Sequence, residues 1–413
     1  MLLTNMMRRV IQRGHITLID ARGRRHEIKG RKPGKHVTVS LHDTSRHRSL
    51  FFNPELTLGE AYMDRTLTVE EGDIADLLAI LMQNTENFDQ HWAFAVSGRW
   101  RYLTRRFAQA NNILRSHKNV AHHYDLSDDL FDRFLDADRF YSCAYFESSH
   151  HDLERAQAAK ARHLAAKLRL EAGCNVLDIG SGWGSLGVHL ARLGAGHVDA
   201  VTLSSEQQKY AQDWLKHEGL SDRVDSKVKD YRDLRGPYDR IVSVGMLEHV
   251  GVGHFREYFE KVRDLLADDG VAVIHAIGRF GPGGSTNPWI AKHIFPGGYI
   301  PALSEVLQVI ESVGLFTTDI EILRLHYAQT LQRWRTRFHD NWDDIADLYD
   351  ERFCRMWDFY LAASEMSFRY GGNMVFQIQL AKDQNTLPLT RDYITDWERE
   401  HPVERQPKDV AAE

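Results

Sequence analysis

Residues 175–184, NVLDIGSGWG, decide the fold of this chain. A short apolar run containing Asp178 leads into a loop with glycines at positions 180, 182 and 184, and the following SLGVHLARLG has the spacing of an amphipathic helix. Glycine lets a backbone turn sharply and approach a ligand, while the start of a helix offers N–H groups and the positive end of a dipole. The stretch therefore predicts a strand, a ligand-binding loop and a helix.

The same alternation continues downstream. The strand-like HVDAVTLS precedes the helical SEQQKYAQDWLKHEGL, and RVDSKVKD, YDRIVSVG and VAVIHAIG are further short apolar strands. Such alternation predicts an α/β domain with a mostly parallel sheet and right-handed crossovers. Upstream, the alternating runs HITLID and HVTVSL predict a small α+β unit. We divide the chain into an N-terminal accessory domain (1–90), a basic aromatic connector (91–120), the α/β domain (121–383) and a polar C-terminal tail (384–413).

Composition narrows the protein class. The 413 residues are 43% hydrophobic and 27% charged, which is typical of soluble globular proteins. The sequence has neither an apolar run long enough to span a bilayer nor the pattern of a secretory signal. Its three cysteines, Cys143, Cys174 and Cys354, form no CxxC pair and predict neither a disulfide framework nor a zinc site. The histidine spacings also predict no metal, and we expect a cytoplasmic protein.

Positive charge is concentrated near the N-terminus, although the net charge is −6. Residues 1–50 contain twelve Lys or Arg and three acids, and no acid occurs between Asp89 and Asp125. The acid-free stretch interleaves cations with aromatic residues: Arg99, Arg101, Arg105, Arg106, Arg115 and Lys118 with Trp92, Phe94, Trp100, Tyr102 and Phe107. This pattern suits anionic lipid headgroups or nucleic acid, and the alternative is a solvated helix with its rings in a core.

The glycine loop points to a particular cofactor. A nicotinamide fingerprint needs a third glycine where this chain has Ser185. The pattern instead resembles motif I of class I S-adenosylmethionine-dependent methyltransferases, in which the loop accommodates the amino-acid end of the cofactor. By that resemblance Asp178 orients the loop and the cofactor ammonium, beside Gly180, Gly182 and Gly184.

The ends of the second and third strands are also expected to contact the cofactor. Methyltransferases usually place an acid for the ribose at the end of the second strand, but here Thr202 stands there and Asp199 lies within the strand. We therefore expect Thr202 and Gln207 to supply these polar contacts. Asp230 and Tyr231 follow the third strand, where the resemblance implies a carboxylate for the adenine amine and a ring that stacks on it.

Several longer motifs identify a family. The stretches FYSCAYFES (140–148), VLDIGSGWGSLGVHLA, MLEHVG and VIHAIG together resemble the cyclopropane-fatty-acyl-phospholipid synthase family over residues 119–382. The resemblance implies a Rossmann-like catalytic domain and an accessory lipid or dimer domain at the N-terminus. It further implies transfer of a methylene group from S-adenosylmethionine to the cis double bond of an unsaturated phospholipid acyl chain, which forms a cyclopropane ring. The alternative is C-methylation that gives a methyl- or methylene-branched chain.

The resemblance also implies a catalytic set. Bound bicarbonate is the expected base, held by the backbone N–H of Cys143 and by Glu248, His275 and Tyr327, while Tyr141 and Ser142 touch the cofactor. Each of these residues alone has a structural interpretation, and their joint occurrence with YSCAYF favours catalysis. The chain departs from some members at Ser364, where they carry a cysteine; we expect that cysteine to be dispensable.

We expect the protein to act at a membrane surface. The glycine- and proline-rich loop 278–301 carries Trp289, Ile290, Ile294 and Phe295, and it suggests either a lid with exposed apolar tips or an ordinary connection. We expect unsaturated phospholipid of the inner leaflet as substrate, an anionic surface as partner of the connector, a homodimer and no nucleic acid. The protein would associate peripherally with the inner face of the membrane. A lipid-binding module with an inactive catalytic domain is the competing hypothesis.

Overall fold

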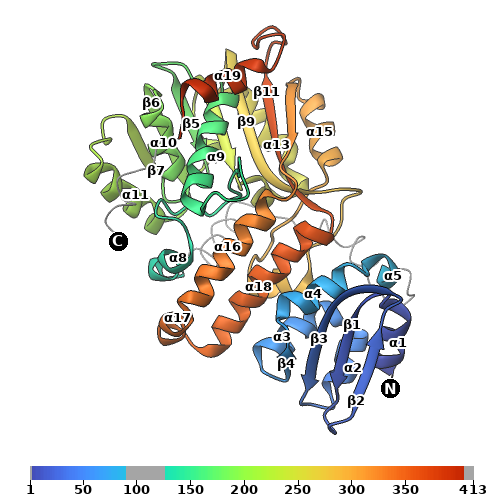
Figure 1. Cartoon of the computed structure of the whole chain (residues 1–413). Helices are drawn as coiled ribbons and strands as arrows, with labels where there is room; N and C mark the ends of the chain where they lie inside the picture. The colour runs from blue at the N-terminus through green and yellow to red at the C-terminus, as the bar shows by residue number, and fades with distance from the viewer. Residues whose placement is uncertain (1, 90–125, 404–413) are drawn as a thin grey trace. The chain divides into compact units, whose positions relative to one another are not determined.

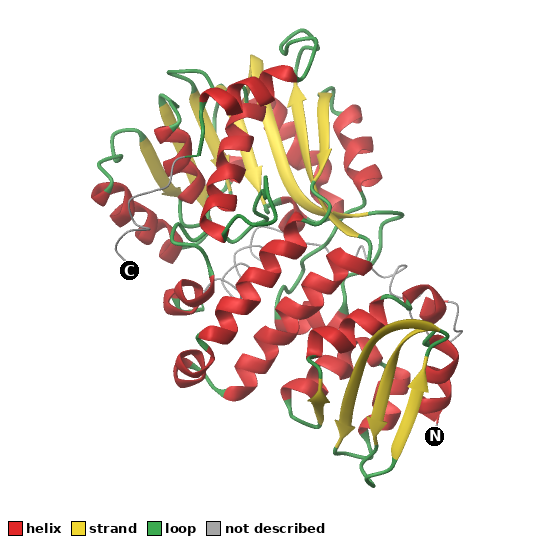
Figure 2. Cartoon of the chain, viewed as in Figure 1, coloured by secondary structure: helices red, strands yellow, loops and turns green. Residues whose placement is uncertain are grey.

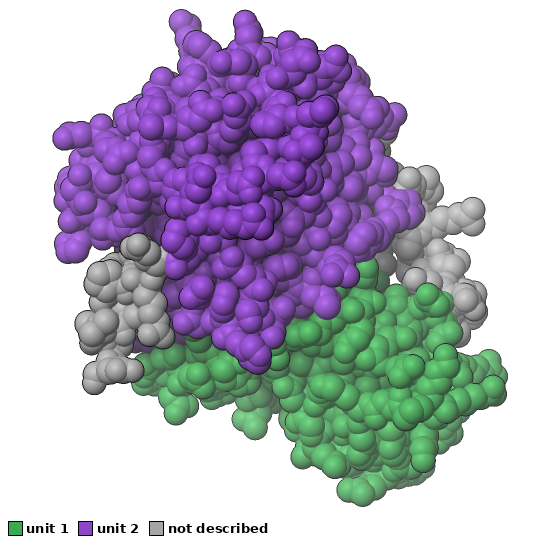
Figure 3. All heavy atoms as spheres, turned by 45° about the horizontal axis from the view of Figure 1, so that its top comes forward, with its two compact units in different colours: residues 1–109, 284–298, 331–373 green, residues 110–283, 299–330, 374–413 purple. Residues whose placement is uncertain are grey.

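The computed structural model describes residues 2–89 and 126–403, so the connector expected at 91–120 lies outside the described residues. The chain forms two compact units, coloured separately in Figure 3. Unit 1 comprises residues 1–109, 284–298 and 331–373, and unit 2 comprises residues 110–283, 299–330 and 374–413. Residues 284–298 and 331–373, expected within the α/β domain, thus group with unit 1. The roles assigned to the domains stay a prediction.

Unit 2 is built on a seven-stranded sheet of order β10-β11-β9-β8-β5-β6-β7 (Figure 1). Its strands are β5 (Asn175–Ile179), β6 (His197–Thr202), β7 (Val224–Val228), β8 (Tyr238–Val244), β9 (Leu266–Arg279), β10 (Phe316–Ile322) and β11 (Asn373–Ala381). The run from β9 to β7 pairs in parallel, while β10 and β11 are antiparallel. The chain leaves β5 toward β6 and later returns to the other side of β5 as β8, which creates a topological switch point there. The predicted α/β fold with a mostly parallel sheet is confirmed.

Helices cover both faces of this sheet (Figure 2). They are α8 (Asp128–Phe134), α9 (Leu153–Lys167), α10 (Ser185–Arg192), α11 (Ser205–His217), α12 (Leu247–Val250), α13 (Phe255–Leu265), α15 (Leu303–Ser312) and α19 (Asp392–Glu400), with 3-10 turns η1 (Tyr231–Asp233) and η2 (Val252–His254). Alternate strand residues enter different cores, because side chains of a strand point to opposite faces. Val176 packs with α9, α10 and α11, whereas Leu177 packs with α13 and α15.

Unit 1 contains a four-stranded sheet of order β2-β1-β3-β4, formed by β1 (Arg13–Ile19), β2 (Arg25–Lys29), β3 (Lys32–Leu41) and β4 (Leu67–Glu71). Its helices are α1 (Leu2–Val10), α2 (Arg46–Phe52), α3 (Pro54–Met63), α4 (Ile74–Met82), α5 (Thr85–Asp89), α14 (Pro288–His293), α17 (Trp342–Leu348) and α18 (Glu351–Tyr370). The long α18 packs against α3 and α4. The unit boundary falls within α16 (His326–Asp340).

The loop at 278–301 differs from the expected lid with exposed tips. Trp289 and Ile294 are each only 1% exposed, and Phe280 is the large hydrophobic side chain that the loop leaves exposed. Trp289 lies in the short helix α14 and packs on α3 at Gly59, where an added Cβ would lie 2.4 Å from the indole nitrogen. Gly59 has no side chain, which leaves room for the indole. Trp289 and Ile294 are therefore buried in unit 1 and are not exposed loop tips.

The polar tail also differs from expectation. Residues 392–400 form α19, which packs against α9; Ile394 is buried, and the partly buried Trp397 packs on the core cluster that includes α9. The spacing of three between these two residues places both on one helix face, a signal too short to stand out in a polar stretch. No helix among residues 2–89 and 126–403 has the length and apolar content needed to cross a membrane.

Candidate active site

A cavity in unit 2 opens at the carboxyl ends of β5, β6 and β8, where open α/β sheets bind ligands. Nine of the ten residues expected to contact the cofactor line it: Tyr141, Ser142, Asp178, Gly180, Gly182, Thr202, Gln207, Asp230 and Tyr231. Gly184 is the exception. It adopts φ 86° at the start of α10, and an added Cβ would lie 3.0 Å from that of Ala211 on α11. Gly184 thus serves the turn and the close packing of two helices.

Asp178 lies beneath the glycine loop at the end of β5. Its side chain is 1% exposed, and its Oδ2 has no hydrogen-bond partner among the described residues. Burial raises the pKa of the carboxyl to about 7, and the nearby positive charge of Lys160 opposes this shift. A buried carboxylate oxygen without a partner is costly, and an ammonium group would satisfy it. This residue therefore fits the amino end of S-adenosylmethionine.

The end of β6 is built as the sequence suggested. The hydroxyl of Thr202 donates to Oε1 of Gln207 at 2.9 Å and accepts from the backbone N–H of Ser204. Asp199, inside the strand, accepts from Lys227 at 2.8 Å and from the hydroxyl of Tyr238 at 2.7 Å. Because the Asp199 carboxylate is held at the amino half of the strand, Thr202 and Gln207 are the polar groups that face the cavity here.

The two expected residues after the third strand, β7, already contact other protein side chains. Asp230 caps the turn η1 and forms two hydrogen bonds with the guanidinium of Arg232, at 2.9 and 2.7 Å. The ring of Tyr231 is 6% exposed and packs edge-on against Tyr258. Arg232 also lines the cavity, and no sequence motif singles it out.

One wall of the cavity comes from residues before β5. Arg139 pairs with Asp128 and Asp132 of α8 and lies 4.0 Å from the ring centroid of Tyr210. The indole N–H of Trp183, in the glycine loop, donates to Asp128 at 3.1 Å. These contacts connect α8 to the loop, and neither Arg139 nor Trp183 was predicted as a site residue.

The four expected catalytic residues lie outside this lining, in two pairs. The first pair is Glu248 on α12 and His275 on β9. Glu248 Oε1 accepts from the backbone N–H of Ile277, two residues beyond His275, at 2.6 Å, while Oε2 is buried without a partner among the described residues. Burial raises the pKa of Glu248 to about 7. Burial also holds the pKa of His275 well below its usual value, helped by the charge of Lys160.

Hydrogen bonding defines the His275 ring further. The amide nitrogen of Gln377 on β11 lies 3.1 Å from Nδ1 of His275 and donates to it. In a neutral imidazole the remaining proton is then on Nε2. Glu248 and His275 thus combine a carboxyl that retains its proton up to about neutral pH with a neutral ring that carries one N–H.

The second pair is Cys143 and Tyr327. The backbone N–H of Ala144 donates to the hydroxyl of Thr330, and that of Phe146 donates to Nδ1 of His326, so the Cys143 segment is bound to the first turns of α16, where Tyr327 lies. The Cys143 thiol is 1% exposed and its pKa is raised by burial. This environment disfavours a thiolate nucleophile. Ser364, in contrast, lies on α18 in unit 1.

Lys160 is a site residue that the sequence analysis missed. It lies in the middle of α9, is 1% exposed and lines the cavity. Its Nζ donates to the hydroxyl of Ser142 at 2.9 Å and lies 3.6 Å from the ring centroid of Phe140. Its charge affects the pKa of both Cys143 and His275, so Lys160 interacts electrostatically with two of the four expected catalytic residues. A lysine among the alanines of AAKARHLAAK was the available signal.

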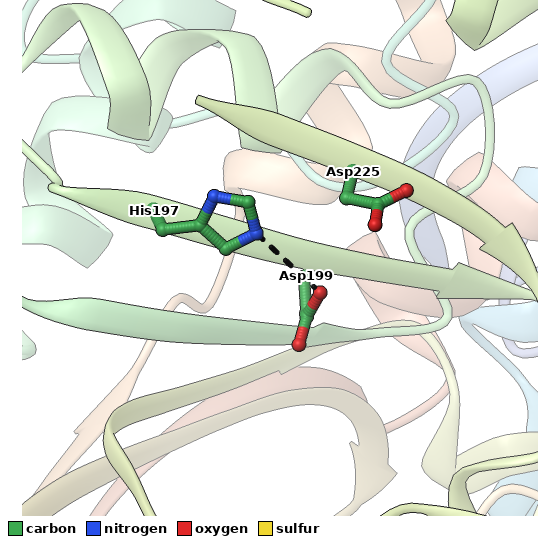
Figure 4. Close-up of side chains that lie close together, drawn as sticks. All are labelled: His197, Asp199 and Asp225. Carbon is green, nitrogen blue, oxygen red and sulfur yellow. Dashed lines mark ion pairs between the residues drawn. The ribbon is translucent and has the colours of Figure 1, made fainter. Parts of the chain in front are cut away.

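Among the described residues, one group of three potential metal ligands lies elsewhere in unit 2. Figure 4 shows His197 and Asp199 on β6 and Asp225 on β7. The ammonium of Lys227 lies 2.8 Å from a carboxylate oxygen of each aspartate. The positive charge that these acids require is therefore supplied by the chain.

Comparison with known proteins agrees with this architecture. Residues 112–378 match the family described as mycolic acid cyclopropane synthetase, and residues 15–92 match a domain of unknown function. The chain belongs to the mycolic acid cyclopropane synthetase family. It is 37% identical to the cyclopropane-fatty-acyl-phospholipid synthase of Escherichia coli over 338 residues, which cover 81% of this chain and 86% of that protein. The suspected family is thus confirmed.

Two more relatives define the chemistry. A tuberculostearic acid methyltransferase of Mycobacterium tuberculosis is 36% identical over 354 residues, which cover 82% of this chain and 80% of that protein. The crystal structure of a mycolic acid cyclopropane synthase complexed with S-adenosylhomocysteine superposes with a TM-score of 0.60 at 32% identity, covering 64% of this chain and 97% of that one. This member of the synthetase family is therefore an S-adenosylmethionine-dependent methyltransferase that modifies lipid double bonds.

Proposed function

We propose that the enzyme transfers a methylene group from S-adenosylmethionine to the cis double bond of an unsaturated acyl chain of membrane phospholipid and so forms a cyclopropane ring. The observation that carries the proposal is the burial of Glu248 and His275 next to the cofactor cavity, with the Glu248 carboxyl bonded to the backbone two residues beyond His275. The similarity to the Escherichia coli phospholipid synthase, which spans most of both chains, supports the substrate class.

The described residues fit a small anion such as bicarbonate. The Oε2 atom of Glu248 is buried without a partner, and the raised pKa allows this carboxyl to donate a proton in a hydrogen bond near neutral pH. Nε2–H of His275 is a second donor, and the hydroxyl of Tyr327 and the backbone N–H of Cys143 are the other groups expected there. These groups are hydrogen-bond donors, and His275 is not fully charged. Such a site can bind an anion without the strong positive charge that would make the anion a weaker base.

The geometry suggests how these residues promote the reaction. When bound, S-adenosylmethionine supplies an electrophilic methyl group, and bicarbonate supplies a base for one proton of that methyl group after its transfer. An alkene is a weak nucleophile, so the glycine loop and Asp178 must hold the cofactor close to the double bond. Glu248 and His275 hold the base in place by hydrogen bonds, Glu248 as the protonated acid that burial favours and His275 through Nε2–H. Glu248 and His275 are themselves largely shielded from bulk water, which suits a reaction that develops positive charge.

C-methylation without ring closure is the second candidate. The tuberculostearic acid methyltransferase is nearly as similar to this chain as the Escherichia coli synthase, at 36% against 37% identity. Both outcomes share the cofactor and the transfer of its methyl group to the alkene. Ring closure then removes a proton from the transferred methyl group, a methylene branch needs a hydride shift before that proton is lost, and a saturated methyl branch also needs a reductant.

We further propose that the enzyme acts as a peripheral protein on the inner face of the membrane. The basic residues 99–118, which lie outside the described residues, would bind the anionic surface, while the N-terminal domain would contribute to a homodimer. No nucleic-acid substrate is needed to explain the basic stretch once the substrate is a phospholipid. Each cation near an anionic surface contributes about 1 kcal/mol to such binding.

The product decides between the two chemistries. We would incubate the full chain with vesicles of unsaturated phospholipid and methyl-labelled S-adenosylmethionine, then extract the lipid and record its proton NMR spectrum. A cyclopropane product gives high-field ring methylene signals. Label incorporated without these signals would establish the branched product instead, and a protein that binds cofactor without labelling any lipid would support the non-catalytic lipid-binding module.

The same assay tests the proposed base. Glu248→Ala and His275→Ala should lose most of the activity, because each removes a hydrogen bond to the anion, whereas Cys143→Ser should retain much of it, because only its backbone is used. Added bicarbonate should stimulate enzyme prepared in carbonate-free buffer. Complete loss of turnover in Cys143→Ser, with cofactor binding unchanged, would contradict the anion site.

A further inference from the structure

The floor of the cofactor cavity contains a buried cation that the proposed reaction does not use. Lys160 is 1% exposed, and an ammonium group has three protons to donate. One reaches the hydroxyl of Ser142 at 2.9 Å, and the ring of Phe140 lies beneath the charge. Among the residues that the structure describes, Lys160 forms no ion pair within 4.0 Å, and the charge of the buried Asp136 acts on it from a longer distance. Burial lowers the pKa of Lys160, while Asp136, Cys143 and Asp178 oppose this shift.

The same floor contains an anion with spare hydrogen-bonding capacity. Asp178 lines the cavity beside Lys160, and its Oδ2 is buried without a partner in the described part of the chain. The two charges influence each other's pKa without being in contact. Buried charges of opposite sign that do not meet are expensive to maintain, and a ligand with both charges can satisfy them together.

We propose that Lys160 binds the carboxylate at the amino-acid end of S-adenosylmethionine, while Asp178 accepts from the ammonium of the same group. An α-amino acid is a zwitterion, so it supplies one partner to each buried charge and adds no net charge to the cavity floor. The proposal rests on the cofactor and is independent of the lipid product.

A purely structural role for Lys160 makes a different prediction. Its hydrogen bond to Ser142 helps to hold the segment 140–142, but Gln157, one helical turn earlier on α9, already contacts this segment. The amide of Gln157 donates to the backbone carbonyls of Ser142 at 3.0 Å and Phe140 at 3.4 Å. Loss of such a support would disturb every ligand of the cavity alike, whereas loss of a carboxylate partner affects only ligands that carry the carboxylate.

A matched pair of ligands separates the two roles. We would measure the binding of S-adenosylhomocysteine and of its decarboxylated analogue, which keeps the amine, to the full chain by calorimetry. In the unchanged protein, S-adenosylhomocysteine should bind at least about tenfold more tightly, because a charge-assisted hydrogen bond is at stake. Equal affinities would overturn the proposal without the use of any variant.

Variants sharpen the test. Lys160→Met should reduce the affinity for S-adenosylhomocysteine at least about tenfold and leave the analogue within about twofold. Lys160→Gln should show the same pattern although it keeps a donor for Ser142, so recovery of affinity there would assign the effect to that hydrogen bond and overturn the proposal. The control Gln157→Met, which loosens segment 140–142, should weaken both ligands by a similar factor. A similar loss for both ligands in Lys160→Met would also overturn it.

Discussion

Burial of the Glu248 carboxyl costs stability but suits the proposed role of this residue in binding an anion. Its carboxyl is buried in unit 2 with one oxygen bonded to the backbone of Ile277 and the other without a described partner. Burial favours the neutral acid, so the pKa rises from 4.5 to about 7. Burial of this carboxyl therefore costs stability whenever the group is ionised.

The raised pKa of Glu248 predicts that the stability of the protein depends on pH. Because the pKa is raised on folding, the folded state binds the proton more tightly, and stability falls as pH rises from about 4.5 to about 7 and then levels off. Glu248→Gln removes this dependence. The free energy of unfolding of the variant, relative to the unchanged protein, should therefore increase by about 3 kcal/mol between pH 4.5 and pH 8. Urea unfolding at both pH values measures it, and a difference that does not change with pH would contradict a buried, protonated Glu248.

At the residue scale, sequence reasoning can place a residue where a motif fixes its position along a strand. Thr202 and Asp178 were placed by their positions at strand ends, and both line the cavity. Lys160 and Arg139 were missed, because their importance depends on which neighbours they meet after folding. Nothing in a single helical sequence shows that one lysine faces a cavity and another faces solvent.

At the scale of elements, the segment 140–146 is held between two helices. The ring of Tyr145 stacks between His163 of α9, at a centroid distance of 4.2 Å, and His326 of α16, at 5.0 Å. Both nitrogens of His163 meet carboxylates: Glu398 of α19 at 2.8 Å and Glu321 of β10 at 2.7 Å. The ring of His163 is therefore held from both sides by carboxylates of two other elements. The C-terminal helix α19 thus supports the segment that carries Cys143.

Glu398 should therefore contribute to stability out of proportion to its place near the C-terminus. Glu398→Ala leaves the buried His163 with one carboxylate and should lower the free energy of unfolding by about 2 kcal/mol. Glu400→Ala removes the same charge from an exposed position of the same helix and should have an effect below about 0.5 kcal/mol. Urea unfolding of the two variants at neutral pH makes the comparison. Equal losses would show that α19 acts through its net charge and not through this contact.

At the scale of the whole molecule, the parallel sheet was predictable because its strands and helices alternate along the chain. Which residues belong to which unit was not predictable from the sequence. Residues 284–298 and 331–373 pack with the N-terminal residues although the chain that surrounds them builds unit 2. A sequence divided into consecutive pieces does not show this arrangement, because the fit of Trp289 against Gly59 depends on two positions 230 residues apart.

The distribution of charge over the molecule leads to the last prediction. The chain has a net charge of −6, yet the acid-free stretch between Asp89 and Asp125 contains six cations, and these would have to overcome the repulsion between an acidic protein and an anionic membrane. Replacement of four of them by glutamine should weaken binding to anionic vesicles at least about a hundredfold, since each contributes about 1 kcal/mol. The four are Arg99, Arg101, Arg105 and Arg106.

Sedimentation with phosphatidylglycerol vesicles measures this loss, and vesicles of phosphatidylcholine give the baseline. The matched control replaces four exposed cations of unit 2 in the same way: Lys209, Lys216, Arg256 and Arg399. Both variants change the net charge equally, so general repulsion from the membrane affects them alike, and a specific role of the connector appears as the difference between them. Binding of the connector variant should also lose most of its dependence on salt, because fewer ion contacts remain to be screened. If the connector variant sediments like the unchanged protein, the membrane surface is recognised elsewhere on the chain.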